Sequence, residues 1–182
     1  MPEPAPSDES LMLAVANGDM RAFEQLVKRH QTAAWRVAVR SVRDVNEAED
    51  LAQQAFLRIL DAADRYEPAA AFRTYLYRVL TRLCIDHLRK KRPLAVDPLP
   101  SVPSSDLSAS QQIERDERAN AVQTALDTLP PKYRVAVVLR YFEGLSGTEI
   151  AEALNTTPKA VERLLARARK RLEPLLKPLL EE

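Results

Sequence analysis

The chain has 182 residues, of which 46% are hydrophobic, 29% are charged and one is a cysteine. This composition suffices for one domain or two small ones, and the single cysteine excludes an internal disulfide and fits a reducing, cytoplasmic compartment. No apolar run approaches the length of a membrane span, and the N-terminus lacks the pattern of a signal peptide. We expect residues 1–10 to be a disordered lead-in.

The net charge of +1 hides a segregated distribution. Residues 71–92 carry seven basic residues and one acid, and residues 158–173 carry six basic residues and two acids. Residues 41–70 carry seven acids and three basic residues. We interpret the two basic segments as contacts for polyanions and the acidic segment as a separate contact for a protein.

Scarce glycine and the absence of a period-two apolar pattern predict an all-α chain. The first expected domain, residues 11–92, begins with a helix over roughly residues 8–16 and a long second helix capped by Asp19. A third helix is expected to begin at Asn46, with Glu49 three residues later. A fourth long helix follows the break at residues 65–68 and ends at Pro93.

Residues 93–111 are rich in proline and serine and have no periodicity, which predicts a flexible linker. A second domain is expected over residues 112–174. It contains one helix up to Leu129, a second between Pro130 and Gly144, and a helix-turn-helix. Pro174 is expected to end it and to leave residues 175–182 as a tail.

The helix-turn-helix has a separate signal for each of its parts. Ser146 and Glu149 have the spacing of a capping box, and Asn155 tolerates the left-handed conformation that ends a helix. Thr157 is a second N-cap, and Pro158 after it suits the first helical position. The pattern predicts a short helix, a tight turn and a longer helix that reads duplex DNA.

On this longer helix the basic residues lie opposite the apolar face. We expect base readout from its N-terminal part and phosphate contacts farther along. Glu162 repels phosphate but could accept a hydrogen bond from a cytosine amino group, and Arg169 and Arg171 either join the contact or merely solvate the helix. The candidate DNA-contacting residues are Thr157, Lys159, Ala160, Arg163, Arg167 and Lys170.

The fourth helix has an outward face on which cations alternate with aromatic or hydroxyl side chains. Bases can stack on such rings while cations follow the backbone, so we interpret the face as a surface for single-stranded nucleic acid. Tyr75 is instead expected in the core. The residues on or beside this face are Tyr66, Phe72, Arg73, Tyr77, Arg78, Thr81 and Arg82.

A metal or catalytic site has little support in the sequence. Cys84 and His87 have the spacing of half a zinc site, but a structural zinc needs four ligands and His30 is distant in sequence. No group of residues supplies a nucleophile, a base and an oxyanion donor together. We therefore expect no metal, no cofactor, no catalytic residue and no small-molecule substrate.

Both halves carry a series of short motifs. They are Asp19-x-x-Ala22-Phe23-x-x-Leu26, Glu47-Ala48-Glu49-Asp50-Leu51-Ala52-Gln53-x-x-Phe56, Phe72-x-Thr74-x-Leu76-Tyr77-Arg78, Ile85-Asp86-x-Leu88-Arg89, Leu129-Pro130-x-x-x-Arg134, Leu139-Arg140-Tyr141, Glu143-Gly144-Leu145-Ser146, Glu149-Ile150-Ala151 and Arg167-Ala168-Arg169. The order and spacing of the motifs together are highly specific, and they cover nearly the whole chain outside the tails and linker. With these motifs the chain resembles bacterial RNA polymerase sigma factors of the extracytoplasmic-function type, in the sigma-70 family.

The resemblance implies two small helical domains, sigma region 2 and sigma region 4, joined by the flexible linker. Region 2 would bind the β′ coiled coil of core RNA polymerase through Asp50, Leu51, Gln53, Gln54 and Phe56. It would also open the −10 promoter element and capture it as single strand. The positions that match this second role are Asp64, Tyr66, Phe72, Arg73, Arg78 and Arg82.

Region 4 would read the −35 element in duplex DNA and contact the β flap of the polymerase, which performs the chemistry. The resemblance also implies promoter-specific initiation for a stress or envelope-type regulon. Inhibition by an anti-sigma factor, often at the inner membrane, is implied as well, and we expect a monomer when the chain is free. Tyr75 and Arg82 depart from the tryptophan and asparagine that are common in the family at these positions.

Two alternatives remain open from the residues alone. An ordinary helix-turn-helix repressor or activator would recognise a palindromic duplex without polymerase. A helical enzyme would need the reactive constellation that the sequence lacks.

Overall fold

The computed structural model describes residues 5–90 and 109–180, with side chains described for residues 5–90 and 117–178. Within these ranges the chain is helical and has no strand, as the sequence predicts, and none of the described helices is long and apolar enough to span a membrane. The elements are α1 (Asp8–Ala16), α2 (Met20–Val42), α3 (Val45–Asp61), η1 (Ala63–Arg65), α4 (Phe72–Lys90), α5 (Ala109–Asp127), α6 (Pro131–Val137), the π-helical turn η2 (Val138–Phe142), α7 (Gly147–Ala153), α8 (Pro158–Leu176) and η3 (Lys177–Leu180).

Polar side chains begin several helices at the positions that the sequence predicts. Asp19 accepts hydrogen bonds from two backbone N–H groups in the first turn of α2. Ser146 and Glu149 form a capping box at the start of α7, and Thr157 accepts a bond from the first turn of α8. These acceptors satisfy donors that the first turn of a helix leaves unpaired.

The junction between α2 and α3 differs from the prediction. Arg43 adopts the left-handed conformation, with φ of 60°, and so ends α2. Asp44 then accepts a hydrogen bond from the backbone N–H of Glu47 at 3.0 Å. The expected start at Asn46 is therefore wrong, because Asp44 caps α3 two residues earlier and Asn46 lies exposed within the first turn.

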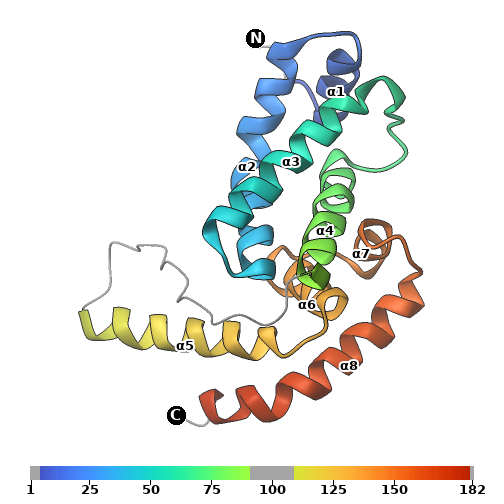
Figure 1. Cartoon of the computed structure of the whole chain (residues 1–182). Coiled ribbons are helices and arrows are strands. Elements are labelled where there is room, and N and C mark those ends of the chain that lie inside the picture. Colours follow the sequence, from blue (N-terminus) through green and yellow to red (C-terminus); the bar gives the residue numbers. More distant parts are fainter. Residues whose placement is uncertain (1–4, 91–108, 181–182) are drawn as a thin grey trace.

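Helices α1 to α4 pack as a bundle around an apolar core (Figure 1). α4 contacts both α2 and α3, and each helix of the bundle contributes fully buried side chains. Each such side chain contributes about 1.5–3 kcal/mol by leaving water. The largest are Tyr77, Phe72, Met12, Leu26, Ile59, Leu76 and Leu80.

Helices α5 to α8 form the second half of the chain. Leu126 and Leu129 pack with Ala168 and Leu172 between α5 and α8. Gly144 closes the turn between η2 and α7 with φ of 71°, a conformation that glycine adopts without a steric penalty. The α7–turn–α8 unit packs against the rest of the chain through the apolar sides of both of its helices.

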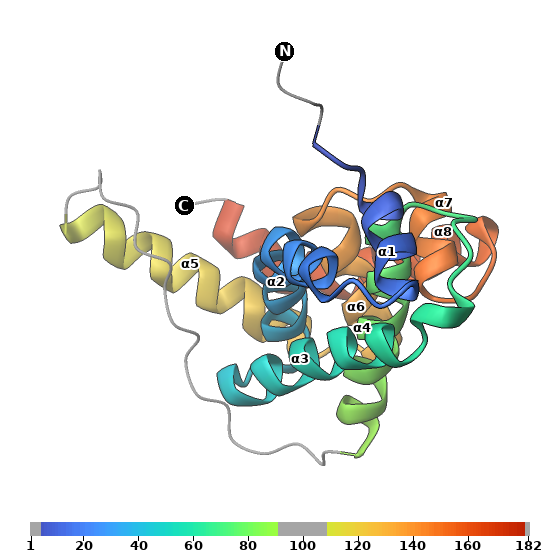
Figure 2. The ribbon, with the colours of Figure 1, turned by 90° about the horizontal axis from the view of Figure 1, so that it is seen from above.

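The two halves pack directly on each other. α6 and α7 lie against α4, and α6 also contacts α2 (Figures 1 and 2). Buried residues of the second half, among them Leu139, Ile150 and Leu154, belong to the same apolar cluster as the core of the first bundle. The free chain is thus one packed unit. The sequence pattern does not predict this packing of the two halves.

In two places a helix begins earlier than the expected domain boundary. Asp8 accepts hydrogen bonds from Arg29 and His30 and lies in the first turn of α1, so the expected disorder of residues 1–10 does not extend to residue 8. α5 begins at Ala109, within the expected linker of residues 93–111. Pro93 and most of that linker lie outside the described residues.

The C-terminal boundary is also wrong, because Pro174 lies inside α8, which continues to Leu176. A proline in a helix removes one backbone hydrogen bond. Leu172 and Leu176 pack against the cluster formed with α5. The apolar stripe therefore continues past the proline, and residues 175 and 176 belong to the helix rather than to the expected tail of residues 175–182.

Candidate functional site

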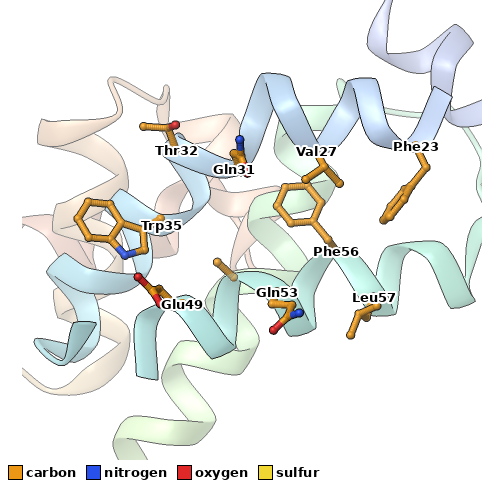
Figure 3. Close-up of a pocket in the computed structure, with 10 residues that line it drawn as sticks. Phe23, Val27, Gln31, Thr32, Trp35, Glu49, Gln53, Phe56 and Leu57 are labelled. Atoms are coloured by element: carbon orange, nitrogen blue, oxygen red, sulfur yellow. The ribbon is translucent and has the colours of Figure 1, made fainter. Parts of the chain in front are cut away.

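An apolar groove lies between α2 and α3 and has a volume of about 530 Å³ (Figure 3). Its exposed apolar rim includes Leu57, whose side chain is 51% exposed. Polar side chains of α3 and of the middle of α2 border the apolar part. The lining residues are Phe23, Val27, Gln31, Thr32, Trp35, Glu49, Ala52, Gln53, Phe56 and Leu57.

The structure divides the five predicted polymerase-binding residues of α3 into two groups. Asp50, Gln53 and Gln54 are exposed and available to a partner. Leu51 and Phe56 are each only 6% exposed. Phe56 forms part of the groove, whereas Leu51 belongs to the core and supports α3 from beneath.

The chemistry of the groove suits a partner helix that is apolar on one side. Apolar contacts would be made with Val27, Phe56 and Leu57, while Gln53 and Glu49 offer hydrogen-bonding groups at the edge. A buried apolar centre with a polar rim is the usual anatomy of a protein interface. The groove, like the acidic charge of residues 41–70, therefore supports a protein contact on α3.

On α4, the expected nucleic-acid face is present in part. Arg78 and Arg82 are exposed, and with other cations they line a cleft of about 800 Å³ between α4 and the second half. The guanidinium of Arg78 lies 5.3 Å from the ring of Tyr75, which in turn lies 5.4 Å from the ring of Tyr66. The cations of the cleft are Arg58, Arg78, Arg82, Arg89 and Lys132.

Two aromatic predictions for this face are corrected by the structure. Phe72 is 1% exposed and packs at 5.2 Å from the ring of His30, so it is a core residue and not a surface for bases. Tyr75, expected in the core, is half-buried and lines the basic cleft. Asp64 is exposed in η1, and Tyr66, the residue after η1, is half-buried.

Tyr77 and Thr81 were expected on the outward face and are covered by the second half. Tyr77 is 0% exposed and Thr81 is 1% exposed. The Tyr77 hydroxyl donates to Glu143, and the Thr81 hydroxyl donates to the carbonyl of Ala153. Arg73 remains exposed, and its guanidinium donates to the backbone carbonyl of Glu143.

In the helix-turn-helix, the observed geometry agrees with the predicted one. Asn155 adopts φ of 47° in the turn, and Pro158 is the first residue of α8. All of the candidate DNA-contacting residues reach the surface. Ala160 is half-buried, and the exposed ones are Thr157, Lys159, Arg163, Arg167 and Lys170.

The two candidate metal ligands in α4 have ordinary structural surroundings. Burial raises the pKa of the Cys84 thiol to about 12, so it is a neutral core side chain at physiological pH. His87 lies 3.4 Å from Glu47. Among the described residues, no three histidine, cysteine or carboxylate side chains are grouped as metal ligands.

Sequence reasoning missed Leu57 and Trp35 in the groove, and it missed Glu143 between the two halves. Leu57 had a usable signal, because it follows Phe56 and falls off the buried stripe of α3, so a large apolar side chain was bound to be exposed. Glu143 had no such signal, since its position depends on how the two halves pack.

Comparisons with known proteins agree with both halves. The family model "Sigma-70 region 2" matches residues 26–93, and "Sigma-70, region 4" matches residues 119–172. The ECF RNA polymerase sigma factor SigE of Mycolicibacterium smegmatis is 36% identical over 94% of this chain and 70% of its own length.

Two solved structures have the same fold. CnrH, in complex with the cytosolic domain of CnrY, has a TM-score of 0.72 and 28% identity, over 95% of this chain and 99% of its own. The sigma factor RpoE from Bartonella quintana, in complex with the anti-sigma factor NepR, has a TM-score of 0.67 and 21% identity, over 85% and 96% of the two chains. The chain therefore belongs to the ECF RNA polymerase sigma factors, the subunits that direct promoter-specific initiation of transcription.

Proposed function

We propose that this sigma factor binds core RNA polymerase through the groove between α2 and α3. The apolar groove carries the proposal, because Phe56, Leu57 and the exposed Gln53 line it, and the exposed Asp50 and Gln54 lie on the same side of α3 as Leu57. Its polymerase partner would be the β′ coiled coil, whose helices suit such a groove. The polymerase then supplies the chemistry, and this chain supplies promoter choice.

Promoter DNA is proposed to contact two other surfaces. Capture of the −10 element as single strand is supported by the exposed Arg78 and Arg82 and by the ring of Tyr75, which all line the basic cleft beside α4. The exposed face of α8 supports reading of the −35 duplex, with Lys159 and Arg163 near the helix start as base-reading candidates. The second half would also contact the β flap.

Further parts of the proposal concern regulation and cellular context. The complexes of CnrH and RpoE support an anti-sigma factor as a partner of this chain. We place the chain in the cytoplasm, as a monomer when free, with an inner-membrane inhibitor as one means of sequestration and a stress or envelope-type regulon as its target. No cofactor and no small-molecule substrate are part of this function.

Exchange of a single exposed leucine tests the groove. Leu57→Ser should weaken binding to core polymerase about tenfold to a hundredfold, because the interface loses the most exposed apolar side chain of the groove. Leu13→Ser is the matched control, since Leu13 is 44% exposed on α1, away from the groove. Equal affinity of the two variants for core polymerase, measured by fluorescence anisotropy, would refute the groove assignment.

The DNA surfaces are tested by separate substitutions. Arg78→Ala should weaken open-complex formation by the holoenzyme without weakening polymerase binding, whereas Arg21→Ala, at an exposed position of α2, should change neither. Arg163→Ala should weaken binding of −35 duplex and leave single-strand binding unchanged. Promoter binding by the chain alone at a palindromic site, with no requirement for polymerase, would instead favour a repressor.

A further inference from the structure

Cations from both halves of the chain line the basic cleft beside α4. The spacing of Arg78, Arg82 and Arg89 by four and seven residues places them along one side of α4. Arg58 is contributed by the last turn of α3, and Lys132 by the first turn of α6. Positive side chains of three helices therefore line one cavity, and one of these helices belongs to the second half.

The described acidic side chains leave most of this positive charge without a partner. Asp86 is the only acid among the residues that line the cleft. In the part of the chain where side chains are described, none of the five cations forms an ion pair. Other arginines between the two halves do have acidic partners, since Arg36 lies 3.8 Å from Glu143 and Arg43 pairs with Asp127. In the cleft, by contrast, like charges of the two halves share one cavity without a matching number of acids.

Such a cavity attracts anions more strongly than a flat surface with the same charge. Walls of low dielectric constant focus the potential of the cations into the cleft. An anion placed between Arg82 and Lys132 also replaces a repulsion between the two halves by two attractions. Asn155 at the end of α7 lines the same cleft, and its side-chain amide can donate a hydrogen bond. The cleft therefore offers the charge and the donors that a small polyanion needs.

The number and kind of these donors select the class of anion. Guanidinium groups bind phosphate oxygens in a bidentate geometry, and a lysine ammonium binds phosphate as a point charge. A single phosphate group carries only about two negative charges at neutral pH, too few to pair with cations from three helices. A chain of linked phosphates carries more charge over a greater length. The cleft volume of about 800 Å³ also lies within the range of about 300–1,000 Å³ that small-molecule sites span.

We propose that the cleft between α4 and α6 binds a small polyphosphate, which bridges the arginines of α3 and α4 to Lys132 of the second half. The ligand is either inorganic or the phosphate chain of a nucleotide. The site goes beyond the proposed promoter contacts and does not depend on them, because Arg58, Arg89 and Lys132 have no part in those contacts. Because its contacts come from both halves, the bound ligand stabilises the folded, packed chain.

Calorimetric titration of the full chain with inorganic tripolyphosphate, without magnesium and at constant ionic strength, tests the site. We expect one site per chain. Arg82→Gln and Lys132→Gln should each weaken binding about threefold to tenfold, because each removes a charge-assisted contact. Arg169→Gln is the matched control, since it removes the same charge from an exposed position of α8 outside the cleft. Equal losses in all three variants would reduce the binding to general attraction of anions and overturn the proposal, as would unchanged binding in Lys132→Gln.

Two further ligands define what the site recognises. Orthophosphate should bind at least about tenfold more weakly than tripolyphosphate, because it cannot reach cations of both halves at once. Equal affinity for the two would contradict a bridging ligand. ATP then distinguishes the two sources of the phosphate chain. Tighter binding of ATP than of tripolyphosphate assigns the site to nucleotides, and weaker binding assigns it to inorganic polyphosphate.

Urea unfolding of the same proteins tests the link between binding and stability. Excess tripolyphosphate should raise the urea midpoint of the unaltered chain and of Arg169→Gln, because the ligand binds the folded state. The same concentration should raise the midpoint of Lys132→Gln less, in keeping with its weaker affinity. Midpoints without ligand show whether each variant folds normally. An unaltered chain whose midpoint does not respond to tripolyphosphate, or a response of the same size in Lys132→Gln, would refute the bridge between the halves.

Discussion

Tyr77→Phe removes a single hydroxyl from the contact between the two halves and leaves the ring in place. Tyr77 is 0% exposed, and its hydroxyl donates to the Glu143 carboxylate at 2.9 Å. Burial is the main cause that raises the pKa of Tyr77 to about 12, so the hydroxyl stays protonated and donates at neutral pH. A hydrogen bond to a charged group contributes about 1.5–3 kcal/mol when the acceptor would otherwise be left buried without it.

The free energy of unfolding of the full chain should therefore fall by about 1.5–3 kcal/mol in Tyr77→Phe. Urea titration measures it, with far-UV circular dichroism and the fluorescence of Trp35 as two probes whose transitions must coincide. In the double variant with Glu143→Gln, the two losses should be non-additive by about 1 kcal/mol. A loss below about 0.5 kcal/mol, or strict additivity, would refute a direct bond between these side chains in solution.

Three further predictions concern the helices themselves. Burial raises the pKa of Cys84 to about 12, so this thiol should resist alkylation by iodoacetamide at neutral pH until urea unfolds the chain. Rapid alkylation of the folded chain would contradict the burial of Cys84. Ser146→Ala removes the cap of α7 and should lower the free energy of unfolding by about 1 kcal/mol, with Ser146→Thr, which keeps a capping hydroxyl, as the comparison. Burial acts to raise the pKa of Asp8, but hydrogen bonds from Arg29 and His30 outweigh burial, so the net pKa is lowered. The stabilisation from Asp8 is therefore complete above the unfolded pKa of about 4 and is lost as pH falls through the lower folded pKa. The difference in unfolding free energy between the unaltered chain and Asp8→Asn should accordingly shrink on acidification below about pH 4, and a constant difference would contradict the ion pair.

Local signals were predicted well because they act within a few residues. The capping box of Ser146 and Glu149, the left-handed Asn155 and the Thr157–Pro158 start of α8 all have the predicted form. Each depends on a bond or a backbone angle within about one helical turn. The same reasoning failed at Asn46, because two adjacent residues, Arg43 and Asp44, end one helix and cap the next.

Surfaces were predicted less well, because exposure depends on contacts between distant segments. The period of α4 places Tyr77 and Thr81 away from the first bundle, as the structure confirms, but the second half covers both. Phe72 is buried because α1 and α2 pack over the start of α4, where its backbone N–H donates to Glu9. Periodicity identifies the side of a helix but not what another part of the chain places on it.

Reconstitution with core RNA polymerase tests the central claim most directly. Transcripts made by the holoenzyme from the source organism's genomic DNA would be mapped at their 5′ ends. We predict discrete starts that core polymerase alone does not give, each preceded by two shared sequence blocks at a fixed spacing, and their loss in Leu57→Ser but not in Leu13→Ser. The absence of starts above those of core polymerase, or equal activity of the two leucine variants, would contradict the account.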